Sequence, residues 1–113
     1  MILIMRGIRV IAKKVAKSGI LGFNDKKFIN YINKLTLAAQ KVNGFQNTRS
    51  YWEKDYNNIV AFSISDWDSE KDWNKWLNSK NRQNINNEHK NVILSEEFNI
   101  LIKSKNNDNT FLL

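Results

Sequence analysis

Three of the four tryptophans in this chain lie within ten residues of one another, at positions 67, 73 and 76. Tryptophan is a large apolar side chain whose single N–H group needs a hydrogen-bond acceptor when it is buried. Three such side chains packed together form either a corner of the core or the wall of a pocket for a flat ligand. Core packing is the commoner outcome for Trp73 and Trp76, which share one helix face if the segment is helical. Both alternatives hold together where the core itself bounds the pocket.

Few other side chains in the sequence are of types that suit catalysis. His89 is the single histidine, and therefore the only side chain whose type serves as a base near neutral pH. The absence of cysteine excludes disulfides, a thiolate nucleophile and cysteine-bound zinc. Asp66 and Asp68 flank Trp67, but the end of a strand and the start of a helix explain both. No carboxylate pair has glycosidase or metal-ligand spacing, so we expect no metal site.

The tryptophans lie where a predicted strand gives way to a predicted helix. Ser69 followed by Asp72 resembles a capping box, and the helix that it starts runs to about Asn78. A second and more polar helical piece follows, from about Lys80 to Lys90. The strand before them, Ile59 to Trp67, alternates between a face with Val60, Phe62 and Ile64 and a face with Ala61, Ser63, Ser65 and Trp67.

The remaining segments predict three more strands and one long helix. Gly7 to Val15 is a strand with Ile8, Val10 and Ala12 on one face and Arg9, Ile11, Lys13 and Val15 on the other. Asn24 or Asp25 caps a helix that Gly44 ends and that carries Phe28, Ile32, Leu35, Ala39 and Val42 on its apolar face. The other elements are strands at Phe45–Lys54 and Phe98–Lys103, a loop at Ser18–Gly22, a hairpin loop at Asp55–Asn58 and a polar tail over 104–113.

The order of these elements, β-α-β-β-α-β, is that of a ferredoxin-like α+β fold with a four-stranded antiparallel sheet. The 113 residues suffice for one domain, with a core over about residues 6–103. We expect Ile11, Val15 and Trp67 on the sheet face that the helices leave open. Because apolar residues there need a partner, a second copy of the sheet is the economical cover, and we predict a homodimer.

The composition limits the partners of the chain. Its net charge of +7 comes from lysines and arginines scattered through every segment, which favours a solvated basic surface over a nucleic-acid site. The predicted third strand also lacks the basic, glycine-containing consensus of RNA-recognition motifs, so we expect no nucleic-acid partner. Met1 to Met5 is too short for a signal sequence or a membrane span, and we expect a cytoplasmic protein without a membrane partner.

Several motifs, in order and with matching spacing, resemble the antibiotic biosynthesis monooxygenase (ABM) domain superfamily over about residues 6–103. The resemblance rests on GIRVIAKKV at 7–15, AAQKVNGF at 38–45, SYWEKD at 50–55 and SDWDSEKDWNKWLNS at 65–79. It implies a dimeric α+β barrel whose protomers hold an aromatic substrate between sheet and helices. Several enzymes of the family oxidise anthrones or quinols with O₂ and use neither flavin nor metal.

The resemblance implies a cofactor-independent monooxygenase that oxidises a small quinol- or anthrone-like molecule with O₂. Such a protein has to bind the substrate, orient it and take a proton from it. The expected substrate-binding residues are Trp67, Trp73, Arg9 and Tyr51, and the expected catalytic residues are Asn86, Trp76 and His89.

A related branch of the family binds haem and degrades it, which gives an alternative function with haem as the cofactor. Those relatives carry a catalytic tryptophan, matched here by Trp76, and an iron-binding histidine ten residues later, where this chain has Asn86. His89 lies about one helical turn further on. Many family members also carry a histidine two or three residues after Ser79, where this chain has Asn81 and Arg82. A dimeric domain that binds a small ligand without catalysis is the other alternative.

Overall fold

The computed structural model describes residues 7–17, 23–54 and 58–103. The predicted loop at Ser18–Gly22, most of the hairpin loop at Asp55–Asn58 and the predicted tail lie outside these ranges. The capping role predicted for Asn24 or Asp25 rests on side chains that are also outside the description. Among the residues described, no helix is long and apolar enough to cross a membrane.

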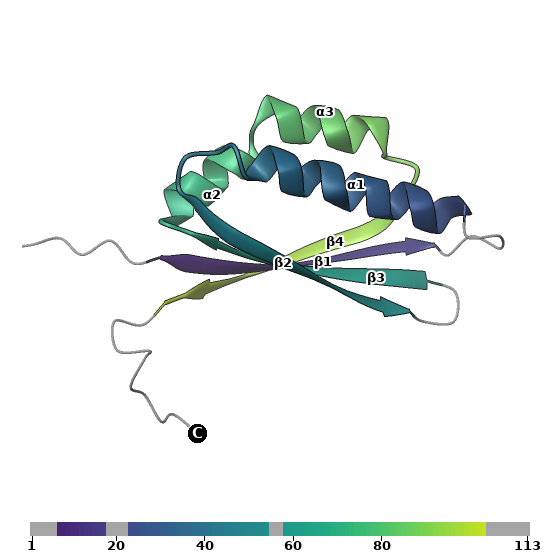
Figure 1. Ribbon diagram of the computed structural model, residues 1–113, viewed down its shortest axis with the longest axis horizontal. Helices are drawn as coiled ribbons and strands as arrows, with labels where there is room; N and C mark the ends of the chain where they lie inside the picture. The colour runs from purple at the N-terminus through teal and green to yellow at the C-terminus, as the bar shows by residue number, and fades with distance from the viewer. Residues whose placement is uncertain (1–6, 18–22, 55–57, 104–113) are drawn as a thin grey trace, which may run out of the picture.

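The described elements form a four-stranded antiparallel sheet with three helices on one face (Figure 1). The strand order is β2-β3-β1-β4, so that β1 and β3 are central. This arrangement confirms the predicted ferredoxin-like fold, with the polar helical piece as an additional helix. The elements are β1 (Ile8–Lys17), α1 (Phe23–Ala39), β2 (Phe45–Lys54), β3 (Asn58–Trp67), α2 (Glu70–Leu77), α3 (Lys80–Glu88) and β4 (Ile93–Ile102).

Two element boundaries differ clearly from the prediction. Strand β4 begins at Ile93 and not at Phe98, because Glu96 is paired with Lys14 across the sheet although its side chain is charged. Helix α1 ends at Ala39, and the N–H group of Val42 donates to the Ala39 carbonyl at 3.0 Å in the turn that follows. Val42 still packs on the core from this turn.

Trp67 faces the helices, and the prediction that it lies on the open face is wrong. It pairs with Ile8 across the β1–β3 ladder, and paired residues share a face of the sheet. Its indole is 1% exposed and belongs to the core cluster. The alternation predicted for this strand is correct, but the two faces are exchanged. Val60, Phe62 and Ile64 therefore lie on the open face of the sheet, together with Ile11 and Val15.

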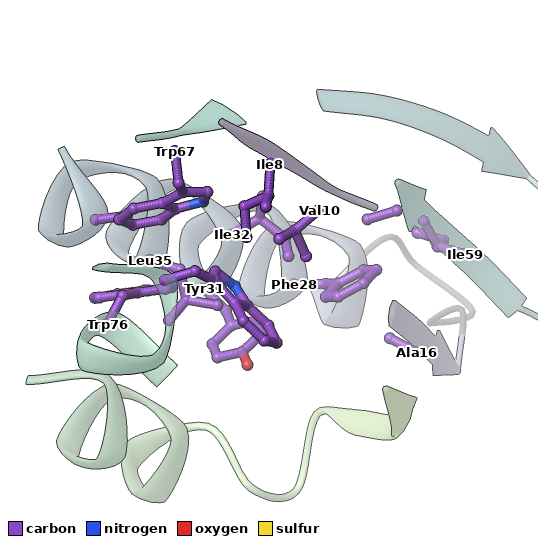
Figure 2. Close-up of a cluster of buried hydrophobic side chains, with 13 residues drawn as sticks. Ile8, Val10, Ala16, Phe28, Tyr31, Ile32, Leu35, Ile59, Trp67 and Trp76 are labelled. Atoms are coloured by element: carbon purple, nitrogen blue, oxygen red, sulfur yellow. The ribbon is translucent and has the colours of Figure 1, made fainter. Parts of the chain in front are cut away.

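The core fills the layer between the helices and the sheet (Figure 2). The predicted apolar face of α1 is confirmed, since Phe28, Ile32, Leu35 and Ala39 are buried, and Tyr31 joins it at the same helical spacing. From the sheet, β1 contributes side chains at every second position, as its alternation predicts. These are Ile8, Val10, Ala12 and Ala16, with Lys14 among them.

The junction before α2 is fixed by Gly44 and Ser69. The hydroxyl of Ser69 accepts from the N–H group of Asp72 at 3.2 Å and donates to its carboxylate at 2.8 Å, which confirms the capping motif. Gly44 has a φ of +92°, and its carbonyl accepts from the N–H group of Asp68 at 2.7 Å. A Cβ at position 44 would lie 2.3 Å from the Asp72 carboxyl group. The start of β2 and the start of α2 are therefore packed too closely for any other residue.

Candidate functional site

A cavity of about 50 Å³ lies between the sheet and the helices, beside the tryptophans. It exists because β3 presents Ser63 and Ser65 to the helices, where larger side chains would fill the layer. Its walls combine aromatic and aliphatic side chains, and its polar groups come from three strands of the sheet, β1, β2 and β3, and from helices α1 and α3. The aromatic lining is Phe45, Trp67, Trp73, Trp76 and Phe98, and the main polar lining is Lys14, Thr48, Ser63, Ser65 and Arg82.

All three clustered tryptophans line this cavity and also belong to the core, so the two alternatives for them hold together. The indole N–H of Trp67 donates to the Ser65 hydroxyl at 2.9 Å, which satisfies its one donor. Phe45 packs edge-on against Trp67, and Phe98 packs edge-on against Trp73, with ring centroids 5.3 and 5.5 Å apart. These contacts hold the walls in place.

One end of the cavity is charged, with Lys14 and Arg82 lining it and Glu96 behind them. The guanidinium of Arg82 donates to the Glu96 carboxylate at 2.7 Å, and Nζ of Lys14 lies 3.4 Å from its other oxygen. Lys14 is 5% and Arg82 8% exposed. Both cations also lie over the Phe98 ring, at 5.8 and 5.6 Å from its centroid.

These charged residues were not among the predicted site residues. A usable signal was present, because the alternation that turns Ile8, Val10 and Ala12 inward also turns Lys14 inward. A lysine on the buried face of a strand needs a partner. The partner, Glu96, lies before the predicted start of the last strand, and Arg82 lies on the predicted polar helical piece.

Burial shifts the proton affinities of two groups at this end. It lowers the pKa of Lys14, because removal from water opposes the charged form more strongly than Glu96 favours it, and Arg82 adds repulsion. Burial also raises the pKa of Tyr31, and the nearby Glu96 carboxylate acts in the same direction. Tyr31 therefore stays protonated, and its hydroxyl donates a hydrogen bond to the Asn86 side-chain oxygen.

Asn86 and His89 contact Tyr31 and do not line the cavity beside the tryptophans. Asn86 lines a separate hollow of about 240 Å³ between α1, α3 and β4, together with Tyr31 and Glu96. His89 packs on Tyr31 with ring centroids 5.3 Å apart, and its Nδ1 lies 2.8 Å from the Ile85 carbonyl oxygen. It lines neither this hollow nor the cavity beside the tryptophans.

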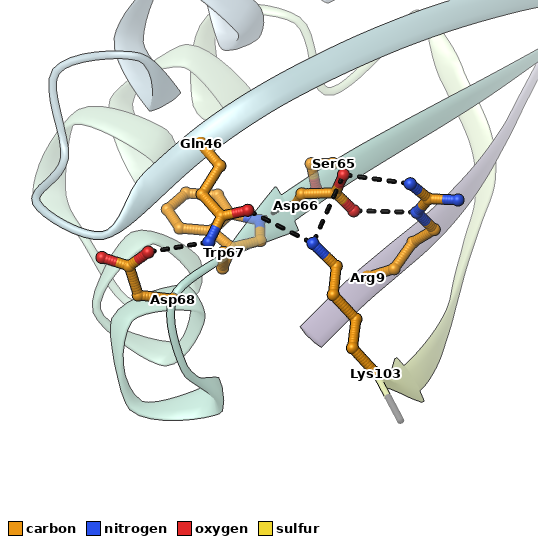
Figure 3. A network of polar contacts seen from close by, with 7 residues as sticks. All are labelled: Arg9, Gln46, Ser65, Asp66, Trp67, Asp68 and Lys103. Atoms are coloured by element: carbon orange, nitrogen blue, oxygen red, sulfur yellow. Dashed lines mark hydrogen bonds and ion pairs between the residues drawn. The ribbon is translucent and has the colours of Figure 1, made fainter. Parts of the chain in front are cut away.

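Arg9 and Tyr51 lie on the open face of the sheet, so the structure does not bring them to the tryptophans. They line a hollow of about 170 Å³ with Asn47, Arg49, Ile64 and Asp66. Arg9 binds both carboxylate oxygens of Asp66, at 2.8 and 3.0 Å, and Lys103 lies 3.7 Å from the same carboxylate (Figure 3). The Arg9 hydrogen bonds are the main reason that the pKa of Asp66 lies below its usual value.

The residues present do not fit haem. The side-chain oxygen of Asn86, ten residues after Trp76, already accepts the Tyr31 hydroxyl. His89, the one imidazole, is apart from the cavity that Trp76 lines. In the ranges that the structure describes, no cluster of three or more His, Cys, Asp and Glu side chains is arranged to hold a metal ion.

Solved structures of the same fold include a cofactor-independent oxygenase. A variant of that enzyme, SnoaB from Streptomyces nogalater, is 12% identical and matches 88% of this chain and 93% of its own, with a TM-score of 0.68. A conserved protein from Methanosarcina mazei Go1 is 23% identical over 88% of this chain and 95% of its own, with a TM-score of 0.70. A Nitrosomonas europaea protein, provisionally named an antibiotic biosynthesis monooxygenase, is 7% identical over 93% of this chain and 96% of its own, with a TM-score of 0.65.

The fold and the site together define a class, that of α+β proteins with an aromatic cavity between a ferredoxin-like sheet and its helices. No protein-family model matches the sequence, and no curated protein matches it either. The solved structures show that the fold is the one found in antibiotic biosynthesis monooxygenases, which confirms the resemblance at the level of the fold.

Proposed function

We propose that this protein is a cofactor-independent monooxygenase that oxidises a small quinol- or anthrone-like molecule with O₂. The observation that supports this most directly is a cavity between sheet and helices with tryptophan walls and with Lys14 and Arg82 at one end. Aromatic walls suit a flat substrate, and the Arg82 guanidinium at the charged end favours the anion that such a substrate forms when it loses a proton. The monooxygenase fold of the solved neighbours supports the same class of reaction.

The reaction needs little from the protein beyond binding, orientation and proton transfer. In an anthrone, a CH₂ group becomes C=O, so one atom of O₂ enters the product and the other leaves as water with the two hydrogens. We assign Trp67, Trp73 and Trp76 to the walls. The hydroxyls of Thr48, Ser63 and Ser65 lie along the floor, where they can orient an oxygen of the substrate. Asn86 acts indirectly, by holding Tyr31.

Substrate binding on this proposal widens the cavity. A space of about 50 Å³ accommodates a few waters, whereas ligand pockets enclose roughly 300 Å³ or more. The walls that must give way are side chains, because the cavity lies in the packed layer and the sheet floor is fixed by its ladders.

Oxygen uptake by a variant with a filled cavity tests this function. Ser63→Leu places a larger side chain on the cavity floor, and we expect it to abolish the oxygen uptake that the unmodified protein shows with an anthrone. Ser50→Leu is the matched control, because Ser50 pairs with Ser63 but is exposed and does not line the cavity. Equal uptake by all three proteins, or none above the buffer rate, would contradict the proposal. Saturable binding without uptake would instead support the non-catalytic alternative.

We also propose that the protein is a homodimer located in the cytoplasm. The open face of the sheet carries Ile11, Val15, Phe62 and Ile64, and no helix among the described residues covers it (Figure 1). Pairing with a second sheet would remove these side chains from water.

A further inference from the structure

The proposed oxidation requires a proton acceptor, and the single histidine does not line the cavity. The charged and titratable groups at or next to the charged end of the cavity are Lys14 from β1, Arg82 from α3, Glu96 from β4 and Tyr31 from α1. No titratable side chain faces them from β3, whose residues there are Ala61 and Ser63. The acceptor is therefore to be sought among these four groups.

Three of the four are unsuited to take a proton. A guanidinium stays protonated in proteins, which excludes Arg82. Glu96 is engaged by Arg82 at 2.7 Å and by Lys14 at 3.4 Å, and it is not among the residues that line the cavity. Tyr31 stays protonated, and its hydroxyl donates a hydrogen bond to Asn86.

Lys14 differs from the other three in both position and proton affinity. Its side chain lines the cavity, and its residue is 5% exposed. Two cations share one carboxylate here, and burying the second charge without a partner of its own is unfavourable. The pKa of Lys14 is lowered accordingly. A neutral amine at this position has a lone pair available to a ligand.

We propose that Lys14 is the proton acceptor of the cavity and that Arg82 stabilises the anion that remains. This inference rests on the proposed function for its substrate, a phenol or an enolisable anthrone. The substrate O–H bond breaks, and its proton forms an N–H bond with the Lys14 nitrogen. The electron pair stays on the substrate oxygen and spreads into the ring, which then reacts with O₂. Lys14 becomes an ammonium group when the substrate beside it becomes an anion, so that the site gains both charges at once.

Binding of 4-nitrophenol tests this assignment without relying on oxygenase activity, because its phenol and phenolate forms absorb at different wavelengths. The titration is run about one pH unit below the pKa of the free phenol, in weak buffer with a pH indicator. We expect the unmodified protein to bind the phenolate with no net release of protons. Lys14→Met should bind the neutral phenol. Lys14→Arg carries a permanent charge and cannot take a proton, so any phenolate that it binds should be matched by a proton released to the medium.

Lys75→Arg and Lys75→Met, on the exposed face of α2, serve as matched controls and should behave like the unmodified protein. One proton released per phenolate bound by the unmodified protein would overturn the assignment, because Lys14 would then be charged already. Binding of the neutral phenol, or no binding, would overturn it too. With an anthrone, both Lys14 variants should lose at least about 100-fold in kcat. If 4-nitrophenol binds with the expected proton balance but an anthrone gives no oxygen uptake, the oxygenase function is refuted. The assignment of Lys14 as the proton acceptor then still stands.

Discussion

Arg82 lies three residues after Ser79, at a position where many proteins of the resembled family carry a histidine. The structure turns its guanidinium into the layer between sheet and helices, against Glu96 and the Phe98 ring. An arginine there can stabilise an anion but cannot accept a proton. On the proposed function, the proton acceptor therefore has to come from another element, and Lys14 on β1 lines the same cavity.

Removing only one partner of the Arg82–Glu96 ion pair should lower the stability of the fold. Arg82→Met leaves the carboxylate with the more distant Lys14, and we expect the free energy of unfolding to fall by about 3 kcal/mol. Adding Glu96→Leu to that variant should recover most of the loss, because no charge of the pair then remains buried. Denaturant unfolding of the two variants measures this. A double variant less stable than Arg82→Met would contradict it.

Asp66 should make the stability of the fold depend on pH in the acid range. Its pKa is lower in the folded state, mainly through the Arg9 hydrogen bonds, so the folded state binds the proton more weakly. The resulting stabilisation is present above the ordinary carboxyl pKa of about 4 and is lost as the pH falls through the folded-state pKa. In Asp66→Asn this part of the pH dependence should be absent. Thermal unfolding between about pH 2 and pH 6 tests it, with exposed Asp68→Asn as the control.

At the scale of elements, side-chain periodicity predicted most of the fold. The apolar face of α1, the alternation of β1 and the Ser69 cap are each signalled by neighbours in the sequence. The start of β4 is not, because Glu96 is inward-facing only through partners on β1 and α3, far away in the sequence. The face predicted for Trp67 is wrong for a similar reason. Alternation separates the two faces of a strand but does not say which one the helices cover.

Substitution at either of two positions where β2 and α2 meet should lower the free energy of unfolding. Ser69→Ala removes the acceptor for the Asp72 N–H group, and we expect it to lower the free energy of unfolding by about 1 kcal/mol. Gly44→Ala should cost more, about 2 kcal/mol or above, because the positive φ and the contact with Asp72 act together. Asn43→Ala, at the exposed neighbouring residue, is the control for the second variant. Chemical unfolding curves give all three values.

At the scale of the whole molecule, the two faces of the sheet have different roles. The helix-covered face holds the cavity and its charged end, whereas the open face holds Arg9, Asp66 and an apolar stripe that includes Phe62 and Ile64. Alternation within each strand does not show which of Arg9, Tyr51 and Trp67 share a face of the sheet. Only the register of the ladders shows that they lie on opposite faces.

The proposed dimer can be tested through the open face. We expect light scattering to give the mass of two chains for the unmodified protein and of one chain for Phe62→Glu, whose charge would be buried between the sheets. Lys71→Glu, on the exposed side of α2, should leave the dimer intact. An unmodified protein that is monomeric at all concentrations would contradict the dimer without affecting the cavity.

Isotope labelling tests the central claim, that the cavity between sheet and helices catalyses a monooxygenation, most directly. The protein is incubated with an anthrone under ¹⁸O₂, without added cofactor, and the product is analysed by mass spectrometry. We predict one ¹⁸O atom per molecule of product, formed faster than in buffer by the unmodified protein and by Ser50→Leu, and at the buffer rate by Ser63→Leu. Unlabelled product, or labelled product formed equally fast by the Ser63→Leu variant, would contradict the claim.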